Sequence, residues 1–255
     1  MKILLMILLL FGFFIVHAVK MMRLYLILLD RQIPFARFVP AYFRTTLVNL
    51  IVPFKLGEVY RVCEFWRLSG GFNTGFFSVL VDRFFDTFAI VLILLPYQMI
   101  VSGRVTLPVI LLSVFLVVIV FAYVIFPSTY RFLNRYIIMT RSSQKSMAVL
   151  KGLEVVNEWY EYVQNLISGR YGILILFSLL AWIAELFVIT GFAKLGGKSF
   201  SIGDFGTYIE SIISGKTDAI TWQYNIIGAA IILIAAVVFT ILYLLSSRKG
   251  AKGND

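Results

Sequence analysis

The sequence contains one cysteine, Cys63, and one histidine, His17, among its 255 residues. A single cysteine excludes an intramolecular disulfide and a metal cluster built on thiolates. A lone histidine without a cysteine partner argues against a zinc site, and its position inside an apolar run is typical of a packed or interfacial residue. We therefore expect no metal site, no cofactor and no catalytic residue.

Charged residues are scarce as well. They make up 14% of the chain, and hydrophobic residues make up 60%, whereas a soluble domain has about 25% and 45–50% respectively. A globule of this size cannot bury so much apolar surface, so lipid must cover it. Unbroken apolar runs at 107–126 and 226–245 indicate helices and not the alternating strands of a membrane barrel. The sequence predicts an all-α polytopic membrane protein.

The charges that are present are mostly basic, with 23 Lys and Arg against 13 Asp and Glu. In a soluble protein this excess would suggest a nucleic-acid partner. In a membrane protein it follows from the positive-inside rule and from attraction to anionic headgroups. We expect no nucleic-acid partner and a location in the cytoplasmic membrane.

We predict a single transmembrane domain over residues 1–255, with about five spanning helices. Its expected parts are N-terminal helices over 1–126, a basic cytoplasmic linker and amphipathic helix over 127–170, C-terminal helices over 171–247, and a polar tail over 248–255. Pro127 is expected to end the helix that precedes it. An i, i+3, i+4 apolar pattern over 151–168 predicts the amphipathic helix.

The first apolar run resembles a signal peptide, but it continues to Leu29. An uncleaved first helix is therefore the favoured interpretation, and cleavage is the alternative. Lys20, Arg23 and Arg31 lie toward the C-terminal end of this run, which predicts a cytoplasmic end there and an external N-terminus. The basic tail predicts a cytoplasmic C-terminus.

Residues 38–68 form an apolar stretch that is basic at both ends. Because both ends should prefer the cytoplasm, we expect a re-entrant pair of half-helices hinged at Pro53 and Gly57. An ordinary short spanning helix is the alternative. A second dip, from the outer side, is expected near residues 200–216. The helices up to residue 97 then have the shape of those after residue 171 with the opposite orientation, which suggests an inverted repeat.

Two charged patches interrupt the apolar sequence and are the candidate site. They consist of Lys55, Gly57, Glu58 and Arg61, and of Asp82, Arg83 and Asp86. Ionisable groups at a bilayer centre cost about 2.5–3.5 kcal/mol each on insertion scales, so they are kept there mainly when they pair or have a function.

The spacing of these residues predicts contacts. Glu58 and Arg61 can pair at i, i+3, and Asp82 and Asp86 share a helix face. We expect Arg61→Ala to leave Glu58 unpaired. Arginine forks and a helix N-terminus near Gly57 suit an anionic phosphate headgroup. The alternative is that these groups only clamp helices together.

Glu185 lies in the middle of a later apolar run. It is either a proton-coupling carboxylate or a hydrogen-bonded packing residue, and the sequence does not decide between the two.

The run Pro53-x-Lys55-x-Gly57-Glu58-x-x-Arg61, followed by Asp82-Arg83-x-x-Asp86, resembles the signature of the lysylphosphatidylglycerol synthase transmembrane family. The usual pattern has Arg at the position of Lys55 and Glu at the position of Asp82. The resemblance covers about residues 15–195 and implies a flippase-type membrane domain. The family often has a glycine-rich motif late in the chain, and here only residues 203–214 correspond to it, with a weaker pattern. We expect a stand-alone member that lacks the aminoacyltransferase domain and makes no lysyl lipid by itself.

The predicted function is transport of an anionic, phosphate-bearing lipid between leaflets, either a phospholipid or a polyprenyl-phosphate-linked lipid. One alternative is a membrane enzyme that acts on a lipid phosphate with Glu58, Asp82 or Asp86 as base. Another is an accessory subunit of a lipid- or polysaccharide-modifying complex. Expected partners are membrane lipids, a second copy of the chain, or a membrane enzyme.

Overall fold

The computed structural model describes residues 2–252 apart from 53–55, 141–143, 198, 202, 207 and 210–218. Within these residues every regular element is a helix, which confirms the all-α prediction. The long helices are α1 (Lys2–Ile27), α2 (Phe35–Ile51), α3 (Leu56–Ser69), α4 (Phe72–Tyr97), α5 (Leu107–Thr140), α6 (Gln144–Ile167), α7 (Tyr171–Leu195) and α9 (Ala219–Lys252). A 3-10 turn covers Leu29–Arg31, and a π-helical turn covers Gln98–Ser102.

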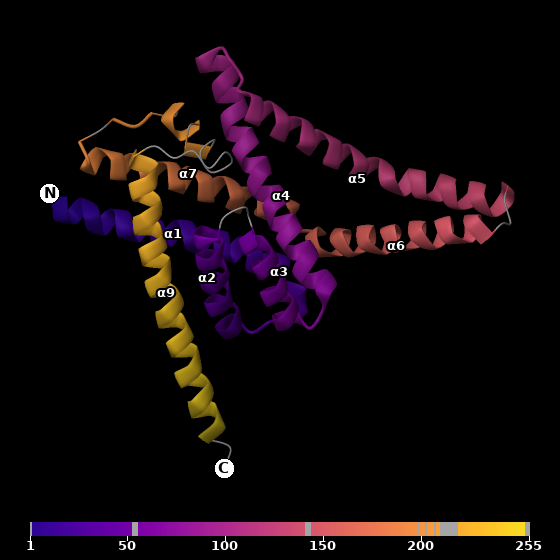
Figure 1. The fold of residues 1–255 in the computed structure, drawn as a ribbon, viewed down its shortest axis with the longest axis horizontal. Coiled ribbons are helices and arrows are strands. Elements are labelled where there is room, and N and C mark those ends of the chain that lie inside the picture. The colour runs from indigo at the N-terminus through magenta and orange to yellow at the C-terminus, as the bar shows by residue number, and fades with distance from the viewer. Residues whose placement is uncertain are drawn as a thin grey trace.

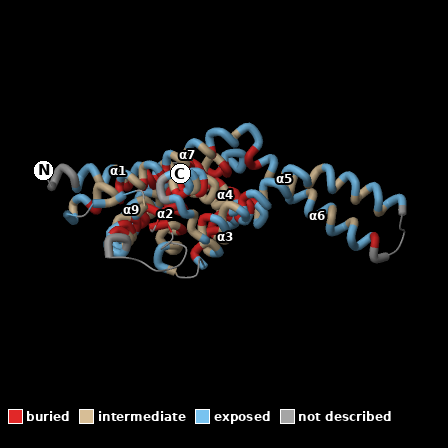
Figure 2. Tube along the Cα trace, turned by 90° about the horizontal axis from the view of Figure 1, so that it is seen from above, coloured by how far each residue is buried: buried red, intermediate tan, exposed pale blue. Residues whose placement is uncertain are grey.

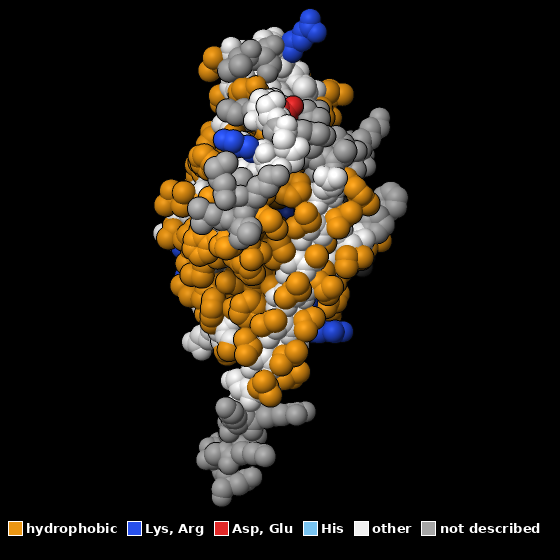
Figure 3. Space-filling model, turned by 90° about the vertical axis from the view of Figure 1, so that its left-hand side faces the viewer, with side chains coloured by type: hydrophobic (Ala, Val, Ile, Leu, Met, Phe, Trp, Pro, Cys, Tyr) orange, Lys and Arg blue, Asp and Glu red, His pale blue; other side chains and the backbone are white. Residues whose placement is uncertain are grey.

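Four of these helices contain stretches long and apolar enough to cross a membrane. The stretches are Met6–Ile27, Leu107–Met139, Tyr171–Leu195 and Trp222–Ser246. Figure 3 shows one face on which hydrophobic side chains cover the middle of the molecule, with Lys and Arg toward its ends and rim. The chain is thus a polytopic membrane protein, as predicted. α4, the fifth helix expected to span, is 26 residues long but carries three charged residues near its middle, and it is not among the four.

α1 packs along α7 in the antiparallel direction (Figure 1). Two glycines make this approach close. A Cβ on Gly12 would lie 2.8 Å from Val188 Cγ2, and a Cβ on Gly191 would lie 2.7 Å from Leu9 Cδ2. Small residues at such contacts are the usual means by which membrane helices approach each other closely.

α2, α3 and α4 fold back on one another in sequence order. A Cβ on Gly57 would lie 2.4 Å from the Asn49 Cα, and one on Gly75 would lie 2.5 Å from the Val62 carbonyl oxygen. The two glycines therefore set the spacing of α3 against its neighbours on both sides. The described ends of α2 and α3 enclose residues 53–55, so the expected hinge at Pro53 lies outside the described residues. That 38–68 is re-entrant stays a prediction.

Pro127 does not end its helix, contrary to the sequence prediction. α5 continues through it to Thr140. A proline removes one intrahelical hydrogen bond, and the turns on either side of Pro127 hold the helix together. The Arg131 Nε also donates to the Pro127 carbonyl oxygen at 3.2 Å. Residues 127–140, expected as part of a linker, are thus helical, and α6 begins earlier than the predicted 151.

The α5–α6 hairpin projects away from the body of the protein (Figure 1), and most of its length is exposed (Figure 2). The buried core lies instead where α1, α2, α3, α4 and α7 meet. His17 belongs to this core, with its Nδ1 3.4 Å from the Tyr42 hydroxyl oxygen. α9 packs across α2, where Phe43 and Phe239 stack with ring centroids 5.1 Å apart.

The inverted repeat also stays a prediction. Of the first three segments, α1 and α4 are described, and α2–α3 is described apart from residues 53–55. Of the second dip, expected at 200–216, the structure describes only residues 200–209 with gaps. The far end of the polar tail likewise lies outside the described residues.

Candidate functional site

The charged residues of α3 and α4 meet lysine, arginine and glutamate side chains of α1 and α7 in the core. Eight side chains form what we call the ion-pair network. Six are joined directly by ion pairs, namely Arg23, Glu58, Arg61, Asp82, Arg83 and Asp86, and Lys20 and Glu185 form a pair of their own beside them. The two acids of α4 are four residues apart and lie on one face, which turns both toward α1.

Arg23 of α1 is the centre of the network. Its Nε donates to Asp82 Oδ1 at 2.8 Å, and its Nη1 donates to Asp86 Oδ1 at 3.0 Å. The same Nη1 lies 3.0 Å from the Ser178 Oγ of α7. Arg23 and Asp82 are each 1% exposed. This arginine therefore ties α1, α4 and α7 together through charge-assisted hydrogen bonds, which are roughly twice as strong as neutral ones.

Asp82 is shared by three arginines. Its second oxygen, Oδ2, lies 3.4 Å from Arg61 Nη1 and 3.4 Å from Arg83 Nη2. The pair expected from spacing, Glu58 with Arg61, is present at 3.8 Å but is longer than the Arg61–Asp82 contact. The buried carboxylate on α4 is thus the nearer partner of the arginine on α3.

Arg83 is held more loosely than Arg23. It contacts three carboxylates at 3.3, 3.4 and 3.5 Å, those of Glu58, Asp82 and Asp86. Its side chain is 41% exposed. Glu58 is itself supported by Asn49, whose Nδ2 donates to Glu58 Oε1 at 2.8 Å. Arg83 is therefore the cation of the network with the most access from outside.

Glu185 of α7 anchors the other end of the network. It forms an ion pair with Lys20 of α1, and its Oε1 accepts a hydrogen bond from the Tyr208 hydroxyl at 2.8 Å. The Lys20 Nζ lies 4.9 Å from the Trp182 ring centroid, and the Trp182 Nε1 donates to Asp86 Oδ1 at 3.1 Å. Trp182 thus links this pair to the carboxylates around Arg23.

The structure brings five of the predicted site residues together: Glu58, Arg61, Asp82, Arg83 and Asp86. Lys55 and Pro53 lie outside the described residues. Gly57 is in the first turn of α3, where it is packed against Asn49. Glu58 occupies the same first turn, so the positive end of the helix dipole already has a carboxylate near it.

Lys20 and Arg23 were missed as site residues. Sequence reasoning counted them only as basic residues that mark a helix end, but both side chains pair with carboxylates inside the protein. Their spacing carried a signal. Residues three apart share a helix face, and two bases on one face inside an apolar run require acidic partners, which Asp82, Asp86 and Glu185 could supply.

The network is electrically balanced. Lys20, Arg23, Arg61 and Arg83 supply four positive charges, and Glu58, Asp82, Asp86 and Glu185 supply four negative charges. Removing ions from water costs several kcal/mol each, and only close pairing offsets that cost. Balance therefore explains how eight ionisable groups are kept in an apolar core.

Metal binding finds no support among the described residues, since no group of three or more His, Cys, Asp or Glu side chains there could hold an ion. Several hydrogen-bonding atoms of the network do have unused capacity. Glu58 Oε2, Arg61 Nε and Arg83 Nε are buried without a hydrogen-bond partner among the described residues. An oxygen-rich anion would suit the two arginine N–H groups.

Comparison with known proteins gives one match. The family model described as lysylphosphatidylglycerol synthase TM region matches residues 1–198. This range contains the whole ion-pair network and leaves out α9. Curated proteins and solved structures gave no match. Since the matched range is well over half of the 255 residues, the chain belongs to the lysylphosphatidylglycerol synthase transmembrane family.

Proposed function

We propose that this protein moves an anionic, phosphate-bearing lipid between the leaflets of the membrane, with Arg83 as the group that receives the phosphate. The observation that carries the proposal is the position of Arg83 in a buried network of ion pairs. It is the most exposed arginine of the network, at 41% against 5% for Arg61 and 2% for Arg23, and it belongs to a protein of a lipid-handling family.

The charge balance restricts how an anion can be received. Because the four cations and four carboxylates of the described network cancel, a phosphate that binds there shares a cation that is already paired. Arg23 is a poor candidate, since its side chain is 2% exposed and its contacts to Asp82 and Asp86 are 2.8 and 3.0 Å. Arg61 has long contacts as well, at 3.4 and 3.8 Å, but its side chain is only 5% exposed. The side chain of Arg83 is 41% exposed and its contacts are all 3.3 Å or longer, so it can turn toward a ligand without opening the packed core.

A shared cation also suits transport. A site that holds its ligand too tightly cannot release it, and an ion pair that reforms on release restores the empty state. Arg83 can leave its carboxylates to bind a lipid phosphate and can pair with them again when the lipid is released. Arg23 keeps the helices in place meanwhile through its separate contacts to Asp82, Asp86 and Ser178.

The test is leaflet exchange in liposomes that contain the purified full chain. Fluorescent phosphatidylglycerol and a fluorescent polyprenyl phosphate are used in separate vesicles, with fluorescent phosphatidylcholine as the zwitterionic comparison whose headgroup has no net charge. A bleaching reagent that reaches only the outer leaflet measures exchange. We expect exchange of at least one anionic probe above that of phosphatidylcholine, and the two vesicle sets distinguish the lipid class.

Arg83→Gln is the decisive variant, because it removes the shared charge from a partly exposed position. Arg135→Gln is the matched control, since Arg135 is exposed on α5 and takes no part in the network. We expect exchange to be lost in Arg83→Gln and kept in Arg135→Gln. Wild-type protein without exchange of either probe, or a folded Arg83→Gln variant with full exchange, would overturn the proposal.

A further inference from the structure

A second site lies away from the ion-pair network, where α4, α5 and α6 enclose an open apolar groove of about 240 Å³. Its lining is entirely apolar or aromatic and consists of Phe77, Ala122, Tyr123, Phe126, Val156, Trp159, Tyr160 and Val163. None of these residues belongs to the network. The groove therefore needs an explanation of its own, which does not depend on the function proposed above.

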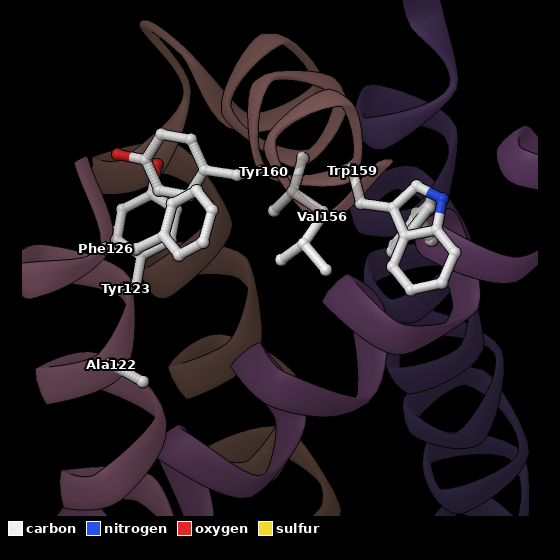
Figure 4. Close-up of a pocket in the computed structure, with 8 residues that line it drawn as sticks. Ala122, Tyr123, Phe126, Val156, Trp159 and Tyr160 are labelled. Carbon is white, nitrogen blue, oxygen red and sulfur yellow. The ribbon is translucent and has the colours of Figure 1, made fainter. Parts of the chain in front are cut away.

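The groove has two aromatic walls. Tyr160 of α6 joins Tyr123 and Phe126 of α5, with ring centroids 5.0 Å apart in both pairs. Trp159 forms the other wall with Phe77 of α4, at 6.1 Å. Figure 4 shows the two walls on either side of Val156, with Ala122 further along α5. The space between them is elongated and lined by flat rings, a shape that suits a hydrocarbon chain.

One edge of the groove is polar. The Tyr123 hydroxyl lies 3.1 Å from the Tyr171 hydroxyl at the start of α7, and Figure 4 shows the hydroxyl ends of Tyr123 and Tyr160 turned away from Val156. Aromatic residues with one polar end are enriched where membrane meets water. The groove thus offers an apolar interior beside a hydroxyl-bearing edge.

The position of the groove along α5 indicates what can reach it. The candidate span of this helix begins at Leu107, and about 20 residues are needed to cross the hydrocarbon core. Residues 122–126 lie near the middle of the candidate span, which runs from Leu107 to Met139. The groove is therefore at the depth of the lipid hydrocarbon chains.

We propose that this groove binds one hydrocarbon chain of a membrane phospholipid, with the polar end of that lipid toward the side of the Tyr123–Tyr171 edge. Membrane lipid is the apolar molecule present at this depth, and its chain and polar end match the interior and the edge of the groove. The site is separate from the ion-pair network, so a lipid held here occupies the outside of the α4–α5–α6 junction.

The full chain, reconstituted in vesicles with a phosphatidylcholine that carries a diazirine on one acyl chain, tests the proposal. After irradiation, mass spectrometry maps the labelled peptides. We expect peptides containing 122–126 and 156–163 to be labelled several-fold more than the exposed apolar surface of α9. Equal labelling of all apolar surfaces would overturn the proposal.

Two variants that fill the groove test whether the lipid hydrocarbon chain lies inside it. Ala122→Trp should fill the open side and reduce labelling of the groove several-fold. Val117→Trp is the control, because Val117 is 67% exposed on α5 and is not part of the lining, and it should leave the labelling unchanged. Val156→Trp, which fills the groove from α6, repeats the test if Ala122→Trp does not fold. Unchanged labelling in a folded filling variant contradicts the proposal.

Discussion

Arg23 and Asp82 form the most deeply buried ion pair among the described residues, although 59 positions separate them in the chain. Neither side chain exceeds 2% exposure. A buried pair is weak evidence for added stability, because desolvation offsets the attraction, but loss of one partner leaves the other charge buried without compensation. The pair therefore fixes how α1 and α4 are arranged.

Arg23→Met should destabilise the protein strongly. The variant leaves Asp82 and Asp86 without their closest cation, and breaking a buried pair in this way costs about 3–5 kcal/mol. Thermal unfolding of the detergent-purified protein measures the loss. Arg135→Met, at an exposed position on α5, is the control and should change the free energy of unfolding by less than about 0.5 kcal/mol. Equal unfolding temperatures for the two variants would contradict the central role of Arg23.

Arg61→Ala should cost less than Arg23→Met, on the order of 1–3 kcal/mol. The sequence suggested that this change would leave Glu58 unpaired, and that expectation was wrong. Glu58 keeps its hydrogen bond from Asn49 at 2.8 Å and its contact with Arg83 at 3.3 Å. Asp82 likewise keeps Arg23. Unfolding of Arg61→Ala and Arg23→Met under the same conditions measures which variant loses more stability. A larger loss of stability for Arg61→Ala would show that α3 and not α1 dominates the network.

Local spacing predicted much of the site but not its centre. The i, i+4 spacing of Asp82 and Asp86 correctly put both acids on one face, and the i, i+3 spacing of Glu58 and Arg61 gave a real but secondary contact. Arg23 was missed because its partners are distant in sequence, and a charge near the end of an apolar run has an ordinary explanation in topology.

The bounds of the helices were also predicted well where local sequence determines them and less well elsewhere. The apolar runs predicted that one helix ends at residue 97 and that another begins at 171, and α4 and α7 do so. Pro127 was misleading because a propensity rule describes an average proline, whereas this one lies inside a 34-residue helix that continues on both sides of it. The rule that proline ends a helix holds less well where lipid gives the chain no better alternative.

Gly75→Ala should destabilise the contact between α3 and α4. An added Cβ would lie 2.5 Å from the Val62 carbonyl oxygen and 2.7 Å from the Trp66 backbone nitrogen. Backbone atoms cannot move aside as a side chain does, so the helices must separate, and overpacking of this kind costs about 1–3 kcal/mol.

Gly152→Ala is the matched control for that change. Gly152 lies within α6, and a Cβ there would meet nothing within 4 Å. Alanine in place of glycine inside a helix stabilises by about 0.5–1 kcal/mol, so this variant should unfold at a slightly higher temperature than the wild type. The two substitutions are chemically identical, and opposite shifts in unfolding temperature would isolate the effect of close packing at Gly75.

Glu185 is the residue for which the sequence left two interpretations open, and its contacts favour a packing role. The carboxylate joins Lys20 and Tyr208, which come from different parts of the chain. In Glu185→Gln the amide oxygen can still accept from the Tyr208 hydroxyl, but Lys20 loses its counter-charge while it is only 21% exposed. We expect this variant to unfold at a lower temperature than the wild type.

The double variant Lys20→Met/Glu185→Gln separates the two interpretations. Replacement of both charges removes the uncompensated lysine, so stability should return most of the way to that of the wild type. If Glu185 only packs, leaflet exchange returns together with stability, and this is the expected result. If Glu185 carries protons during transport, the double variant folds well but does not exchange lipid, because it has no titratable group at that position. Unfolding temperature and exchange rate measured on one preparation therefore decide between the two roles.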